Sequence, residues 1–260
     1  MPRPLPPSAT SAHRTGALTA ARAALMGLAA LLLAGCAAPV APTHGVVPTT
    51  EPSAQELAQT TSDRLATLAM RANLDSLYLL MDKLYARNPA QWRKTGAASA
   101  QAAAFRVRDA VEHHAPWPDL QGKRDIDAMA WALTPQFRGD RVGALVYATA
   151  DMLITAHGGR TEFFITDQID PQYIYNCARN IEILVWMLAH RHDPASGGLL
   201  LLADEIGDGG RNLSFEREFG KVIGRLDLLA TFTTERHRRA VIGYFQGYLA
   251  VELLRFLPVR

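Results

Sequence analysis

An acidic stretch in the last third of the chain, ADEIGDGGRNLSFEREFGK at residues 203–221, concentrates the side chains that could bind a ligand. Carboxylate, guanidinium and amide groups lie close together in its first half. Loops carry functional residues more often than the elements they connect. We therefore predict a candidate ligand-binding loop that consists of Asp204, Glu205, Asp208, Arg211 and Asn212.

Calcium is the first ligand to consider for these acids, and the spacing argues against it. With Asp204 at the first position of an EF-hand loop, Asp208 occupies the fifth and Gly209 the sixth, as the motif requires. The third and twelfth positions are Ile206 and Phe215, which offer no side-chain oxygen. The sequence thus predicts no calcium site here.

A structural interpretation of the same stretch competes with ligand binding. Gly207, Gly209 and Gly210 favour a turn, and Asn212 or Ser214 can cap the helix after it. This interpretation leaves the concentration of charged groups before the helix unexplained, so both interpretations stay open.

The histidines follow a pattern typical of helix ends. His157 precedes two glycines, and His190 and His192 precede Asp193-Pro194. Imidazole groups at a helix C-terminus complement the helix dipole, and glycine or proline ends the helix. Because there is no His-Glu-x-x-His motif or comparable ligand spacing, the sequence predicts no metal site and no cofactor.

Acidic and thiol groups within the expected helices also have ordinary explanations. Glu182 has Arg179 one helical turn before it, and Asp151 falls on the polar edge of its helix. Cys177 lies among apolar residues, where a small buried thiol is the usual arrangement. The chain has no Gly-x-Ser-x-Gly motif, phosphate-binding loop or dinucleotide-binding motif, so no catalytic residue is predicted.

The start of the chain has the composition of an export signal. Residues 1–22 contain three arginines and no acidic residue, and residues 23–34 are uncharged and rich in alanine and leucine. A basic segment, an apolar run of roughly 7–15 residues and a small-residue cleavage site define a secretory signal peptide. A permanent membrane span needs about 20 apolar residues, so this run is too short for one.

The end of this signal, LAGC at residues 33–36, resembles the lipobox of bacterial lipoproteins. The resemblance implies cleavage before Cys36 and acylation of its sulfur. Each buried CH₂ contributes about 0.8 kcal/mol, so several acyl chains on one cysteine give lasting attachment to a membrane. In lipoproteins of Gram-negative bacteria an aspartate after this cysteine favours the inner membrane, so Ala37 implies the outer membrane.

The charge of the remaining chain argues against nucleic acid as a partner. Three of the 27 Lys and Arg residues and none of the 25 acidic residues lie in residues 1–35, which leaves 24 basic against 25 acidic side chains. Nucleic-acid binding requires a basic face, which a near-neutral body does not indicate. With Cys36 acylated, Cys177 has no partner for a disulfide, so packing must stabilise the fold.

Apolar residues recur every three or four positions through most of residues 54–260, which predicts a mainly α-helical, multi-helix bundle. A break in this pattern in the first helix suggests a kink near Asn73. The expected helices, ended by prolines and glycines, cover residues 54–87, 97–114, 125–133, 141–157 and 171–192.

The C-terminal part is expected to form an antiparallel helix hairpin with its loop at residues 231–234. Each helix of the hairpin contains a Gly-x-x-x-Gly motif, at 220/224 and 243/247, which would permit close approach of the two backbones. The apolar stripes of the two helices are Phe215, Phe219, Val222, Leu226 and Leu229, and Val241, Tyr244, Tyr248 and Val251. Residues 160–166 and 197–204 predict at most a small two-stranded ribbon.

The chain therefore divides into a lipoprotein signal peptide at 1–35, a lipidated Cys36 with a Pro-rich tether to 53, and an α-helical periplasmic domain at 54–260. We expect a non-catalytic binding, assembly or scaffolding role at the outer membrane, with the membrane and an envelope protein as partners. The alternative is a hydrolase-like enzyme that combines an acid of the 204–208 loop with His157. An enzyme should converge polar groups in a deep pocket, whereas a scaffold should expose an apolar groove or patch.

Overall fold

The computed structural model describes residues 51, 53–203, 206–207, 210–211 and 213–254. The expected signal peptide, Cys36 and nearly all of the tether lie outside these residues. The described residues from 53 to 254 belong to one structural unit.

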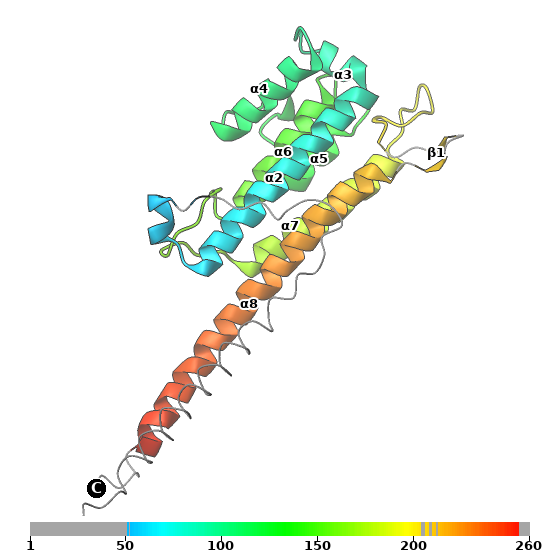
Figure 1. Cartoon of the computed structure of the whole chain (residues 1–260). Coiled ribbons are helices and arrows are strands. Elements are labelled where there is room, and N and C mark those ends of the chain that lie inside the picture. Colours follow the sequence, from blue (N-terminus) through cyan, green and yellow to red (C-terminus); the bar gives the residue numbers. More distant parts are fainter. Residues whose placement is uncertain (1–50, 52, 204–205, 208–209, 212, 255–260) are drawn as a thin grey trace, which may run out of the picture. The chain divides into compact units, whose positions relative to one another are not determined.

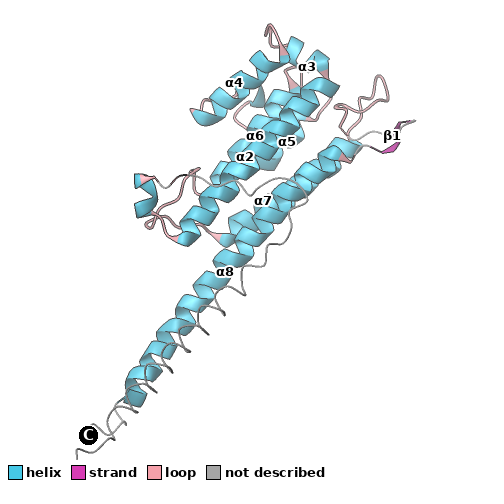
Figure 2. Cartoon of the chain, viewed as in Figure 1, coloured by secondary structure: helices cyan, strands magenta, loops and turns pink. Residues whose placement is uncertain are grey.

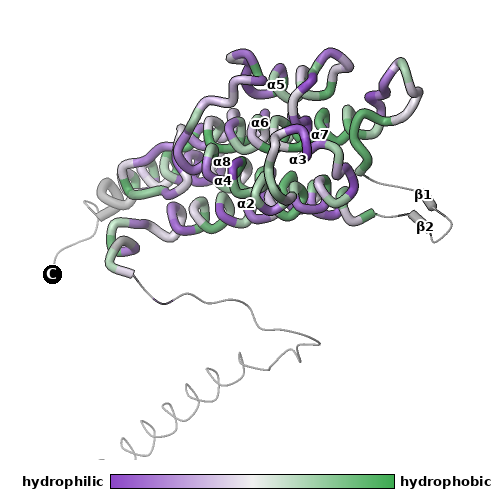
Figure 3. The backbone as a smooth tube through the Cα atoms, turned by 90° about the horizontal axis from the view of Figure 1, so that it is seen from above, coloured by the Kyte–Doolittle hydropathy of each residue, from purple (hydrophilic) through white to green (hydrophobic). Residues whose placement is uncertain are grey.

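This unit is a bundle of helices, as the apolar periodicity predicted (Figures 1 and 2). Hydrophilic and hydrophobic segments alternate along the helices (Figure 3), as expected for helices with one apolar and one polar side. The elements in chain order are η1 Ala54–Ala58, α2 Thr61–Arg87, α3 Pro89–Arg93, α4 Ala100–Glu112, η2 Pro118–Leu120, α5 Asp125–Ala132, α6 Arg141–Ala156, α7 Pro171–His190, β1 Ile206–Gly207, β2 Gly210–Arg211 and α8 Ser214–Leu254.

Local signals in the sequence explain where α2 begins and ends. The Thr60 hydroxyl accepts a hydrogen bond from the Asp63 amide at 3.2 Å, and the Asp63 carboxylate accepts one from the Thr60 amide at 2.8 Å. This reciprocal capping box satisfies amide groups that the first turn of a helix leaves free. At the other end, the residue before a proline disfavours helical geometry, and α2 stops before Asn88-Pro89.

The core forms around α6, which contacts α2, α4, α5 and α7. Thirteen of its 16 residues are buried, so water reaches almost none of its surface. A helix of this kind belongs in the centre of a bundle, and the sequence permits it because Val142–Ala150 contains no charged side chain. The other helices cover it with single apolar stripes.

The break in the apolar pattern of α2 marks a polar contact with α8. Asn73 is fully buried, and its side-chain oxygen accepts a hydrogen bond from the Arg225 guanidinium at 3.0 Å. The same guanidinium donates to the Ala72 carbonyl at 3.0 Å and to the Ser76 hydroxyl at 3.2 Å. The helix itself continues without interruption from Thr61 to Arg87. The break in the apolar pattern thus marks a buried hydrogen-bonded side chain, and the kink expected near Asn73 stays a prediction.

The predicted C-terminal hairpin is wrong, because α8 runs as one helix through residues 231–234. These residues include no glycine or proline that would end a helix. Thr233 is buried on the same face as Leu229, and the Thr234 hydroxyl donates to the Ala230 carbonyl one turn earlier at 2.9 Å. These threonines are thus accommodated within the helix. The second half of α8 projects beyond the other described helices (Figure 1).

A two-stranded ribbon forms, but elsewhere than expected. Ile206–Gly207 pairs with Gly210–Arg211 in antiparallel register. The predicted strand at 199–202 contributes one isolated bridge, between Leu199 and His192. Residues 160–166 contain no strand and instead pack against α2, where the Phe163 amide donates to the Thr67 hydroxyl at 3.0 Å.

Candidate functional site

The predicted ligand-binding loop can be located through the residues that flank it. Asp204, Glu205, Asp208 and Asn212 lie outside the described residues, and Arg211 is described as a backbone position of β2. Just before the loop, the Leu202 amide donates to the Asn88 side-chain oxygen at 2.8 Å, and the Asn88 amide group donates to the Leu202 carbonyl at 2.9 Å. The loop therefore starts beside the C-terminal end of α2.

His157 lies at the opposite end of α2 and is a core residue. Its Nδ1 is 2.7 Å from the Leu153 carbonyl oxygen, and its ring packs on Phe163, whose amide binds Thr67. From Thr67 to Asn88 the helix rises about 30 Å. Burial lowers the pKa of His157 to about 4, so the imidazole is neutral at pH 7. This arrangement offers no support for a hydrolase that pairs His157 with an acid next to Leu202.

The carboxylates inside helices α6 and α7 have arginine partners. Both oxygens of Asp151 accept hydrogen bonds from Arg124, at 2.9 and 3.0 Å. Glu182 forms an ion pair with Arg179 at 2.9 Å, one turn away, as its spacing predicted. Both acids are thus engaged by arginine side chains, which suits a structural role better than proton transfer.

Cys177 is buried, as its apolar surroundings predicted. Burial raises the pKa of its thiol to about 12, and the nearby Asp125 carboxylate adds to this effect. A reactive cysteine needs a lowered pKa and some exposure, so this thiol fills space in the core.

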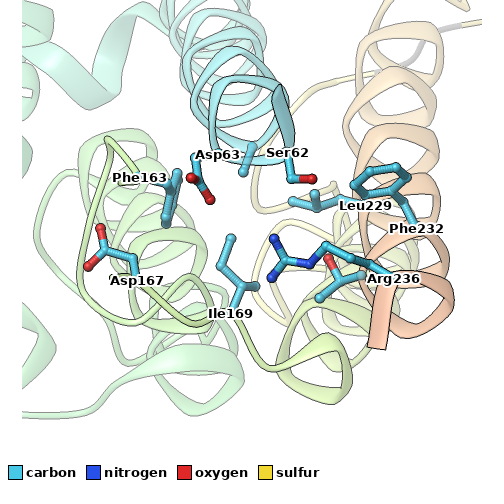
Figure 4. Close-up of a pocket in the computed structure, with 10 residues that line it drawn as sticks. Ser62, Asp63, Phe163, Asp167, Ile169, Leu229, Phe232 and Arg236 are labelled. Carbon is cyan, nitrogen blue, oxygen red and sulfur yellow. The ribbon is translucent and has the colours of Figure 1, made fainter. Parts of the chain in front are cut away.

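A small pocket lies where the start of α2, the 163–169 loop and α8 meet (Figure 4). The Arg236 side chain extends from α8 toward this space, across from Asp63 and Asp167 (Figure 4). Both carboxylates are already engaged, since Asp63 caps α2 and Asp167 pairs with Arg160 at 3.1 Å. The space open to a water centre is about 10 Å³. That volume holds about one water molecule and no substrate.

A shallow groove marks the point where α7 stops covering α8. It is lined by the first turn of α7, including Pro171 and Tyr175, and by Ala230, Thr234 and Glu235 of α8. Beyond Glu235, α8 continues to Leu254, and no other described helix packs along it (Figure 1). This projecting segment is about 28 Å long at 1.5 Å per residue.

The projecting segment of α8 carries a row of exposed apolar side chains, which we call the distal stripe. Its members are between 58% and 76% exposed and are Val241, Tyr244, Phe245, Tyr248 and Leu249. Their spacing of three and four residues places them on one side of the helix. Single exposed apolar residues are ordinary, but a contiguous group of large ones marks an interaction surface.

Between residues 240 and 251, the opposite side of the projecting segment is small and uncharged. Gly243 and Gly247 lie roughly opposite Phe245, and Gln246 lies beside them. A Cβ added to either glycine would meet no atom within 4 Å, and the same holds for Gly220 and Gly224. The close approach that the Gly-x-x-x-Gly motifs predicted is therefore absent at all four glycines.

The spacing of apolar residues in the sequence predicted the distal stripe, but it did not predict that these side chains are exposed. Val241, Tyr244 and Tyr248 were expected to face a partner helix within a hairpin. Their spacing indicated an apolar face correctly, whereas the identity of what covers that face depends on whether α8 bends at 231–234.

Within the described residues, no group of three or more histidine, cysteine or acidic side chains is arranged to hold a metal ion. Among the described helices, none combines the length and the hydropathy that crossing a membrane requires. No family model matches the chain, and neither a search of curated proteins nor a search of solved structures found a match.

Proposed function

We propose that this protein is a lipid-anchored docking protein of the bacterial cell envelope, without catalytic activity. The observation that carries the proposal is the distal stripe, a large apolar surface on a helix that extends past its own bundle. A projecting apolar helix face is the form that helix-based recognition takes in many proteins. The lipobox-like residues 33–36 are the proposed anchor, and Ala37, in place of an aspartate, supports the outer membrane as its location.

The described polar groups favour docking over catalysis. The pocket beside Arg236 holds about one water molecule, and the acids that line it serve a helix cap and an ion pair. His157 and Cys177 are buried and engaged in the core. An enzyme needs a nucleophile or acid–base pair that a substrate can reach.

The docking surface can be tested in cells with a photo-reactive phenylalanine at position 244 of the full chain. We expect irradiation to join this Tyr244 variant to another polypeptide, because docking must cover an apolar side chain that is otherwise exposed. The matched control carries the same group at Gln246, on the other side of the same turn, and should form at least about tenfold less adduct. Equal adducts at both positions, or adducts to lipid alone, would count against the proposal.

The anchor is tested separately by Cys36→Ser. Removal of the acylated sulfur should shift the body from the membrane fraction to the soluble fraction after cell lysis, since the apolar run before Cys36 is too short for a permanent span. A variant that floats with membranes as the unchanged chain does would refute lipid attachment.

A further inference from the structure

The distal stripe continues the face of α8 that α7 covers. Five turns of a helix take about 18 residues, so positions this far apart point the same way. Tyr244 and Tyr248 thus share their direction with Leu226 and Ala230, which are buried in the bundle. The cover ends because α7 begins at Pro171, next to the groove at Ala230. The distal stripe is therefore the second half of a helix-packing surface, and no helix among the described residues covers this half.

We propose that a second copy of this chain supplies the partner helix, through antiparallel pairing of the two projecting α8 segments about Phe245. This inference rests on the proposed docking function and specifies its partner. A stripe that pairs with itself across a two-fold axis must have members related symmetrically about one position. Val241 and Leu249 lie four residues before and after Phe245, and antiparallel pairing places them opposite each other.

Charge also favours the antiparallel register. Arg238 lies seven residues before Phe245, and the sequence has Glu252 seven residues after it. Antiparallel pairing therefore sets the level of Arg238 in one copy at the level of Glu252 in the other. Arg238 pairs with Glu235 within its own helix. A parallel pair in register would align like charges at positions 238 and 252, which charge repulsion disfavours.

The described residues leave room for this pairing, because α7 covers α8 only as far as the groove at Glu235. In an antiparallel pair about Phe245, Glu235 of the second copy lies at the level of position 255 in the first copy, one residue past the described end of α8 at Leu254. The projecting segments can thus lie along each other with the two bundles at opposite ends. An α8 that ended nearer to Glu235 would offer no room for this arrangement.

The exposed area is large enough for a specific dimer. Each aromatic ring of the stripe offers about 100–150 Å² on its exposed fraction. Together with Val241 and Leu249, two copies would bury about 1,000 Å² or more, which reaches the lower range of specific interfaces. Copies anchored in one membrane have a high effective concentration, which increases the occupancy of such an interface.

A lipid surface fits the distal segment less well than a second helix. Helices that lie in a membrane interface have a strongly charged face opposite the apolar one. Residues 240–251 contain no charged side chain, and the side opposite Phe245 consists of Gly243 and Gly247. The arginines 236, 238 and 239 are confined to one end, and two of them pair with Glu235.

Disulfide formation in the full chain directly tests the two-fold axis at Phe245. Phe245→Cys places two thiols against each other at the axis, so mild oxidation of membranes should convert at least half of this variant to a linked dimer. Gln246→Cys is the matched control and should stay below about one tenth. The unchanged chain reports any background from Cys177 or Cys36. Monomer in both variants, or equal dimer in both, would overturn the proposal.

The register is tested by mixing two variants. Val241→Cys and Leu249→Cys, co-expressed as separately tagged full chains, should form a mixed dimer and few homodimers. Homodimers of Val241→Cys alone would indicate a parallel pair and overturn the register. Light scattering tests the pairing without any substitution. The protein mass of the unchanged full chain in detergent should be twice that of one chain. A protein mass equal to that of one chain would contradict pairing.

The outcomes separate this inference from the proposed function. If Phe245→Cys stays monomeric while the photo-reactive Tyr244 variant captures a different protein, the proposed self-pairing is wrong and the proposed docking function is supported. If the polypeptide captured at position 244 is a second copy of this chain, both the docking function and the self-pairing are supported. If no polypeptide is captured at position 244 and no disulfide forms at 245, both fail.

Discussion

An Arg225→Met chain is expected to lose about 3 kcal/mol or more of its free energy of unfolding. The Arg225 guanidinium joins α8 to three groups of α2, and the loss leaves the fully buried Asn73 amide group without this partner. A hydrogen bond from a charged donor contributes about 1.5–3 kcal/mol, and an orphaned buried polar group costs about 1–3 kcal/mol more. Methionine preserves most of the side-chain volume, so the polar contacts are what changes.

Urea unfolding followed by far-ultraviolet circular dichroism measures this loss, with Arg217→Met as the control. Arg217 is an exposed arginine of the same helix. Its replacement should change the free energy of unfolding by about 0.5 kcal/mol or less. Similar losses for the two variants would show that the contact between Arg225 and α2 contributes little.

Acidification from pH 7 to pH 5 is expected to destabilise the fold by about 2 kcal/mol through His157 alone. Burial holds the folded-state pKa of His157 at about 4, below its usual 6.5. The unfolded chain therefore takes up a proton as the pH falls through 6.5, and the folded chain does not until about pH 4. The contribution is fully present above pH 6.5 and is lost progressively as the pH falls toward 4.

The His157 contribution is isolated by comparing variants at both pH values. His157→Gln removes the titrating group, so its free energy of unfolding should fall about 2 kcal/mol less between pH 7 and pH 5 than that of the unchanged chain. His192→Gln, at an exposed position, should keep the original pH dependence. A His157→Gln chain with the same pH dependence as the unchanged chain would contradict a neutral, buried imidazole.

The sequence predicted most helices because their boundaries depend on local signals. Proline after Asn88, the glycines after His157 and the Asp170-Pro171 cap each end or begin a helix without help from the rest of the fold. The short helix α3 was missed, since five residues are too few to show a period.

The sequence did not predict the features that depend on contacts with residues far away in the chain. Threonines at 231–234 are equally suited to a cap or to a helix interior, and the local sequence gives no preference. Asn73 interrupts an apolar pattern in the same way whether it causes a kink or receives a buried arginine, and Arg225 lies 152 positions away. The exposure of the distal stripe likewise depends on where α7 begins, which the residues of α8 do not encode.

The proposed docking requires that protein covers the distal stripe when the chain is attached to its membrane. It is tested most directly by the rate at which a membrane-impermeant maleimide labels Tyr248→Cys and Gln246→Cys in membranes that hold the full chain, under reducing conditions. If protein covers the stripe, position 248 should react at least about tenfold more slowly than position 246. Equal rates at the two positions in the membrane would mean that the stripe faces water, and would contradict the proposed docking.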